Sequence, residues 1–181
     1  SSVTDMSETF RATNAFNGDI SGWDVSKVTN MSRTFSGSSF NGDISRWDVS
    51  NVTTMSMMFQ EASFDGDISK WNVSNVINMS IMFQGASFSG DISAWDVSNV
   101  INMTCFFDGA DNFDRKVIDE WNLNSAIDLD SLFLSICDCC GDAPNEYNRY
   151  SDDGHFEACD KCDHEVCCSC IGFCEHCDKA V

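Results

Sequence analysis

Large apolar residues recur at a fixed interval of 24 residues between positions 16 and 107. Within each interval, an Ile-Ser-x-Trp-Asp-Val segment places Trp and Val two residues apart, which is typical of a short β-strand with one buried face. The group that follows, Val28, Met31 and Phe35 in the first interval, has spacings of three and four, which indicates one face of a short helix or 3₁₀ segment. The recurring landmarks are Phe16/Phe40/Phe64/Phe88, Trp23/Trp47/Trp71/Trp95, Met31/Met55/Met79/Met103 and Phe35/Phe59/Phe83/Phe107.

A fixed period of this length predicts stacked repeats, because one 24-residue unit has too few apolar side chains to fold alone. We therefore expect a leucine-rich-repeat-like solenoid, with a short parallel β-strand and a short helical or 3₁₀ return in each coil. The Trp and Met columns are interpreted as core. A carbohydrate platform made of the Trp column is less favoured, since Trp shares a face with Val in the predicted strand.

The pattern predicts two parts of the chain, a solenoid of about five repeats over residues 1–134 and a cysteine-rich unit over residues 135–181. The solenoid begins in the middle of a repeat, because residues 2–10 align with residues 51–59. In that half repeat Val3, Met6 and Phe10 occupy core positions without the strand that should precede them, so we expect them to contact another copy. The fifth repeat is atypical, as end caps are, since Trp121 follows Trp95 by 26 residues.

The repeated motif Asp-Ile-Ser-x-Trp-Asp-Val-Ser-x-Val-x-x-Met-Ser-x-x-Phe resembles the BspA-like surface-protein repeats of leucine-rich type, a domain of unknown function in microbial lipoproteins and protist surface proteins. The resemblance covers approximately residues 2–134. It implies an extracellular solenoid that serves at the cell surface or in adhesion, and it implies no catalysis. It does not extend to the cysteine-rich segment.

The C-terminal segment contains ten of the eleven cysteines. Four CxxC pairs with nearby His155, His164 and His176 fit zinc, whereas ten cysteines also fit five disulfides in a unit with little core. We favour disulfides without metal, because vicinal cysteines are left over from two four-ligand zinc sites. The disulfide candidates are Cys137, Cys139, Cys140, Cys159, Cys162, Cys167, Cys168, Cys170, Cys174 and Cys177. Cys105 is the candidate for a free thiol, and we expect it to be a small buried hydrophobe.

Five Asn-x-Ser/Thr sequons lie in the repeats and predict N-glycosylation in an oxidising compartment. The candidate sites are Asn30, Asn51, Asn72, Asn78 and Asn102. Asn30, Asn78 and Asn102 share one place in their repeats, between inward Val and Met positions, and we expect their side chains to point outward. Thr54 interrupts this column, which leaves room for glycans.

Columns of Asp residues permit two interpretations. Stacked repeats bring like charges to about 5 Å, the spacing of neighbouring strands, so calcium between carboxylates is one hypothesis. The favoured hypothesis is that each Asp accepts hydrogen bonds from the backbone of its own turn. The candidate calcium ligands are Asp19, Asp43, Asp67 and Asp91, with a second column at Asp24, Asp48, Asn72 and Asp96.

The formal net charge of −19 and the lack of a basic patch disfavour nucleic acid as a partner. No apolar run in the sequence is long enough to span a membrane. No histidine precedes residue 155, so an enzyme is disfavoured and no cofactor is expected. We predict an extracellular structural or surface protein that assembles head to tail into a filament. The alternatives are a cell-surface adhesin or recognition module, with host or matrix glycoproteins as partners, and a zinc-binding interaction protein.

Overall fold

The computed structural model describes residues 2–133. Backbone contacts group Ser1–Phe133 into one compact unit. The predicted cysteine-rich unit lies outside the described residues, and so do its ten disulfide candidates and three histidines.

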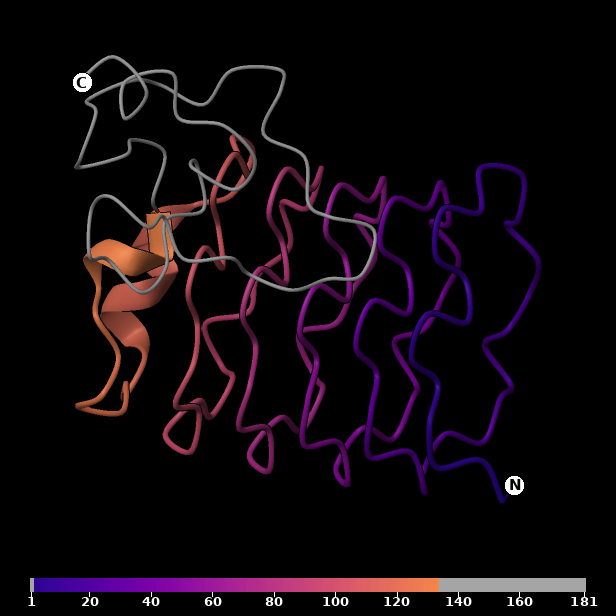
Figure 1. The fold of residues 1–181 in the computed structure, drawn as a ribbon, viewed down its shortest axis with the longest axis horizontal. Coiled ribbons are helices and arrows are strands. Elements are labelled where there is room, and N and C mark those ends of the chain that lie inside the picture. Colours follow the sequence, from indigo (N-terminus) through magenta and orange to yellow (C-terminus); the bar gives the residue numbers. More distant parts are fainter. Residues whose placement is uncertain (1, 134–181) are drawn as a thin grey trace, which may run out of the picture. The chain divides into compact units, whose positions relative to one another are not determined.

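Successive repeats lie side by side and in register along the described unit (Figure 1). Isolated parallel bridges join equivalent residues of neighbouring repeats at one position, and they link Asp5 to Asn30, Asn30 to Thr54, Thr54 to Asn78, and Asn78 to Asn102. Each repeat has two parts, which we call the Trp arm and the Met arm. In the first full repeat, the Trp arm is residues 16–27 and the Met arm is residues 28–37.

The Met arm is built from overlapping turns and bonds to the next repeat. The backbone N–H groups of Met31, Arg33 and Phe35 donate to carbonyls of the following repeat at 2.9 to 3.0 Å. The N–H groups of Thr34 and Ser36 bond back by three residues, to the carbonyls of Met31 and Arg33, and the N–H of Ser32 donates to Oδ1 of Asn30 at 3.0 Å. Since the two kinds of bond alternate, neither a helix nor a strand ladder runs through the arm.

Left-handed backbone at two places in each Met arm explains this irregular path. Arg33 has φ of 56° and Gly37 has φ of 63° in the first full repeat, and both positions recur. The equivalent residues are Glu8, Met57, Ile81 and Cys105 at the first place, and Ala12, Glu61, Gly85 and Gly109 at the second. A left-handed residue cannot continue an α-helix or a β-strand of L-residues.

The predicted leucine-rich-repeat-like solenoid, with a β-strand and a helical return in each coil, is therefore wrong. Within residues 2–133 there is no α-helix and no β-strand. The helices described are two short 3₁₀ helices, η1 (Arg115–Glu120) and η2 (Asp130–Phe133), and both belong to the atypical last repeat. Asp114 caps η1, because its side chain accepts the Lys116 N–H at 3.1 Å. No helix in the described residues is long and apolar enough to cross a membrane.

The core consists of columns of identical side chains. Phe35 stacks on Phe59 at 5.7 Å between ring centroids, and Phe40 stacks on Phe64 at 6.5 Å. The Met, Val and Ile positions of the full repeats are buried in the same cluster. The rings of each pair are nearly parallel, and at this spacing they stack with an offset, the arrangement that aromatic pairs prefer.

Candidate interaction face

The Asp columns proposed for calcium stabilise turns instead. In each repeat the Asp Oδ1 accepts the N–H of the Ser two residues later, as Asp19 does from Ser21 at 3.0 Å. The hydroxyl of Ser21 and its N–H hold the pKa of Asp19 below its ordinary value. The pKa values of Asp43, Asp67 and Asp91 are lowered in the same way. No group of three or more His, Cys, Asp or Glu side chains is placed to hold a metal ion in residues 2–133.

The five sequons differ in exposure. Asn51, Asn72 and Asn102 are exposed, whereas Asn30 and Asn78 are half-buried. The Nδ2 of Asn51 donates to the Ser26 carbonyl at 2.8 Å. Oδ1 of Asn72 accepts both the N–H and the hydroxyl of Ser74, at 3.2 and 2.7 Å.

Cys105 is buried, as the sequence predicted, but it is not a free thiol. It is disulfide-bonded, and its backbone has φ of 53°. The prediction of a free thiol at this position is wrong. The odd number of cysteines shows that one thiol is left over, but it does not show which one. A buried free cysteine and a buried disulfide-bonded cysteine have the same signal in a single sequence.

The three residues predicted for assembly are placed differently from one another. Met6 and Phe10 are buried, because they pack in the same cluster as the first full repeat, whereas Val3 is 47% exposed. Phe10 lies 5.3 Å from Phe35 and 4.5 Å from Phe16, measured between ring centroids. Of the three, Val3 therefore has by far the largest exposed fraction.

The interpretation of the Trp column as core is wrong for its first member, Trp23, which lies partly on the surface. Trp23 is 46% exposed, whereas the other four Trp residues are at most 7% exposed. Each of those four donates its Nε1–H to an Ile carbonyl in the preceding repeat, at 3.0 to 3.1 Å. In residues 2–133 no Trp arm precedes that of Trp23, and its Nε1–H has no such acceptor.

A pocket of about 510 Å³ lies beside Trp23. Its walls combine apolar side chains with two carboxylates, and the lining residues are Val3, Asp5, Met6, Thr9, Gly22, Trp23, Asp24 and Val25. We call this surface the open face. The pocket occupies the place where the Trp arm of a preceding repeat would pack against the first full repeat.

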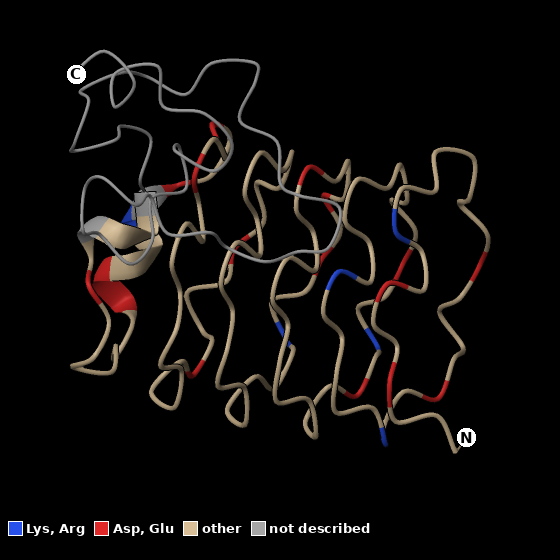
Figure 2. Ribbon diagram, in the orientation of Figure 1, with Lys and Arg blue, Asp and Glu red and all other residues tan. Residues whose placement is uncertain are grey.

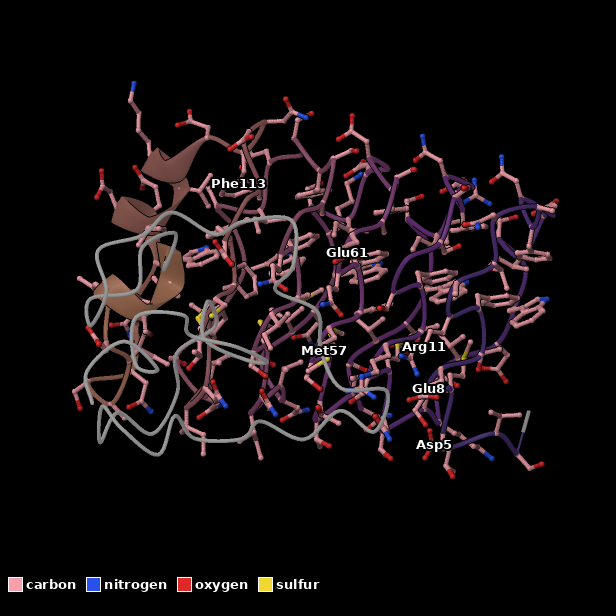
Figure 3. All side chains as sticks on the ribbon, turned by 45° about the horizontal axis from the view of Figure 1, so that its top comes forward. Asp5, Glu8, Arg11, Met57, Glu61 and Phe113 are labelled. Atoms are coloured by element: carbon pink, nitrogen blue, oxygen red, sulfur yellow. The ribbon has the colours of Figure 1, made fainter. Side chains whose placement is uncertain are left out.

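Charged side chains border the Met-arm part of the open face. Figure 3 shows Asp5, Glu8 and Arg11 along the same end of the unit. Glu8 contacts the Arg33 guanidinium at 3.1 Å and the Arg11 guanidinium at 3.7 Å. Asp5 accepts the Ser7 N–H at 2.7 Å, and the hydroxyl and N–H of Ser7 lower its pKa. The carboxylates Asp5 and Asp24 thus remain ionised at neutral pH, because hydrogen bonds lower the pKa of each.

Comparison with known proteins identifies a family. No curated protein and no solved structure gives a match to the chain. A family described as "Mycoplasma protein of unknown function, DUF285" matches residues 1–89 and 38–145. Because these two matches together span well over half of the 181 residues, the chain belongs to the DUF285 family.

Proposed function

We propose that the protein is a non-catalytic, extracellular surface protein that associates with further copies of itself through the open face. The observation that carries the proposal is the exposed Trp23 beside a pocket of about 510 Å³. Partly exposed aromatic residues beside apolar pockets are the usual centres of protein interfaces. The resemblance of the repeats to BspA-like surface proteins, together with membership of DUF285, supports a role at the surface.

The neighbouring repeats show what a partner must supply. Each later Trp arm is covered by the Trp arm before it, which contributes an Ile carbonyl for the indole N–H. A second copy that docks on the open face would use a different part of its own surface. Such a head-to-tail contact does not close on itself, so it propagates as a filament or closes as a ring.

The acidic surface predicts how this association depends on salt. The formal net charge is −19, and Asp and Glu are distributed along the described unit (Figure 2). Copies therefore repel one another at low ionic strength. At physiological salt, charges more than about 8 Å apart are largely screened. Association should accordingly strengthen as the ionic strength rises.

A non-catalytic role agrees with the chemistry of the open face. Residues 2–133 contain no histidine, and the pocket is lined by apolar groups, one threonine and two carboxylates with lowered pKa values. Carboxylates of this kind are poor general acids at neutral pH. The lining is better suited to hold a polypeptide than to transform a substrate.

A recognition module is the second candidate, favoured by an apolar patch on the side of the unit. Ile77, Ile101 and Leu129 are 46%, 58% and 54% exposed. In the earlier repeats the column that contains Ile77 and Ile101 carries Thr29 and Thr53 instead. An adhesin would use this patch for a ligand, whereas a self-assembling protein would use the open face.

Sedimentation analysis of the full chain separates the two candidates. We expect concentration-dependent association of the native chain at physiological salt, and elongated or annular particles by electron microscopy. Trp23→Ala should abolish association, whereas Ile101→Ala, which removes another exposed apolar side chain, should leave it unchanged. A chain that stays monomeric at high concentration would refute self-association. Loss of binding in Ile101→Ala instead of Trp23→Ala would favour recognition through the side patch.

A further inference from the structure

One exposed column near the start of each Met arm changes from polar to apolar along the unit. It carries Thr29 and Thr53 in the first two full repeats, and Ile77 and Ile101 in the next two. Backbone bonds stack these residues, because the N–H of Ile101 donates to the Ile77 carbonyl at 2.9 Å. Both isoleucines are exposed. They form one apolar strip across two neighbouring repeats, which we call the Ile strip.

A sequon lies directly beside the Ile strip. Asn102 follows Ile101, its side chain is exposed, and Thr104 completes the Asn-x-Thr pattern. Oδ1 of Asn102 accepts the Thr104 N–H at 3.1 Å, whereas its Nδ2 donates no hydrogen bond within residues 2–133. An N-linked glycan is attached to an asparagine of this pattern through Nδ2. The turn therefore holds Asn102 by its oxygen and leaves its nitrogen available for a glycan.

The other four sequons lack this combination. Asn30 and Asn51 each use Nδ2 in a hydrogen bond, at 3.2 and 2.8 Å. Asn78 is half-buried. Asn72 is exposed, but the residues before and after it in the chain are both buried. Among the five sequons, Asn102 alone joins an exposed side chain and an unbonded Nδ2 to an exposed apolar neighbour.

We propose that Asn102 carries an N-linked glycan whose first sugars cover Ile101 and Ile77. This inference rests on the proposed location at the surface and is independent of self-association. In the transfer, a bond forms between Nδ2 and C1 of the first sugar. The bond from C1 to the pyrophosphate of a lipid-linked oligosaccharide breaks, the lipid pyrophosphate leaves with the electron pair, and Nδ2 loses one proton to solvent.

The chemistry of an N-acetylglucosamine unit suits this cover. Its ring faces present C–H groups, and its hydroxyls and acetamido group lie at the rim. A ring face laid on isoleucine removes apolar surface of both partners from water, while the rim stays hydrated. Uncovered apolar patches on soluble proteins promote association. A glycan at this position would keep the side of the unit from associating.

The test measures how much the Ile strip contributes to surface hydrophobicity with and without the glycan. The full chain, secreted from a cell that performs N-glycosylation, should show an occupied Asn102 by mass spectrometry. Hydrophobic-interaction chromatography would then compare Ile101→Thr in two backgrounds, the native sequence and Thr104→Ala. Thr104→Ala abolishes the sequon but keeps Asn102. The shift in elution caused by Ile101→Thr should be at least about threefold larger in the Thr104→Ala background, because only there is the isoleucine uncovered.

A matched control removes a glycan elsewhere. Asn72→Gln abolishes an exposed sequon with buried neighbours, so Ile101→Thr should cause the same small shift in that background as in the native sequence. Asn102→Gln provides a second route to the uncovered strip if Thr104→Ala does not fold.

The outcomes separate this inference from the proposed self-association. An unoccupied Asn102 would overturn the inference, and so would an effect of Ile101→Thr that is equal with and without the glycan. Either result leaves self-association through Trp23 standing, because sedimentation of Trp23→Ala measures it separately. A covered strip on a chain that stays monomeric would support the inference and refute self-association.

Discussion

Glycine at position 66 is held in place by the aromatic column, and its replacement by alanine tests how tightly the repeats are packed. A Cβ on Gly66 would lie 2.8 Å from both Cε2 and Cζ of Phe64. Carbon atoms in protein interiors are normally separated by about 3.5 to 4.0 Å. The Phe64 ring would therefore have to move, or the backbone of the turn would have to open.

The surroundings of Phe64 leave the ring no room to move. Phe64 is fully buried. It stacks on Phe59 at 4.4 Å, and it lies between Phe40 and Phe88 at 6.5 and 6.3 Å. A shift of one ring would disturb the rings of two neighbouring repeats, so the strain cannot be relieved locally.

The expected cost follows from two opposing effects. Overpacking a filled core costs about 1–3 kcal/mol, whereas the loss of backbone freedom in the unfolded chain favours alanine by about 0.4–1 kcal/mol. Gly66→Ala should therefore lower the free energy of unfolding by about 1–2 kcal/mol. For a unit of this size, that corresponds to a melting temperature lower by about 4–7 °C.

Two other glycines supply graded controls. A Cβ on Gly22 meets nothing within 4 Å, so Gly22→Ala should be neutral or stabilise by up to about 1 kcal/mol. A Cβ on Gly18 lies 3.1 Å from the half-buried Phe16, which has space to swing aside, and an intermediate effect is expected. Thermal and urea unfolding of the three variants would establish the order. If Gly66→Ala were as mild as Gly22→Ala, the argument from a locked aromatic column would be refuted.

Three further predictions concern hydrogen bonds, a buried acid and glycosylation. Trp71→Phe keeps the aromatic ring but removes the 3.1 Å bond to the Ile44 carbonyl, so urea unfolding should show a loss of about 1–2 kcal/mol. Burial raises the pKa of Asp108, so the native state binds its proton more tightly and this residue's contribution to stability falls as pH rises from about 4 through the raised pKa. Asp108→Asn should therefore be more stable than the native chain at pH 7 and lose that advantage near pH 4; an equal difference at both pH values would contradict this. If the protein is made in a glycosylating secretory pathway, mass spectrometry should show higher glycan occupancy at Asn72 than at Asn51, whose Nδ2 is engaged with the Ser26 carbonyl; the reverse order would count against it.

The repeat architecture shows where sequence reasoning was sufficient. A period of 24 residues, with Phe, Met and Val at fixed places, correctly indicated which side chains form the core and that equivalent residues of neighbouring repeats lie together. Large apolar side chains must be buried, and a strict repeat gives every unit the same environment. The Asp-x-Ser turns were also foreseeable, because Asp readily accepts its own turn's N–H groups.

The path of the backbone was not determined by the same pattern. Spacings of three and four between Val28, Met31 and Phe35 fit a helical face, yet the arm is a series of turns with left-handed residues. One of the two left-handed positions could be predicted from the sequence, because glycine occupies it in three repeats, at Gly37, Gly85 and Gly109. The other position could not, because residues such as Arg33 and Ile81 rarely have positive φ.

The sequence by itself determined the repeat, its register and its core, since these follow from which side chains avoid water. Only the tertiary structure decided that neighbouring repeats are joined by alternating turn and inter-repeat bonds, because that choice depends on carbonyls supplied by the next repeat, 23 positions away in the full repeats. It alone also distinguished Trp23 from Trp47, although both stand in the same motif. Whether an indole is exposed, and whether a carbonyl accepts a hydrogen bond, depends on the neighbouring repeat that packs against it. The motif that contains the residue does not specify that neighbour.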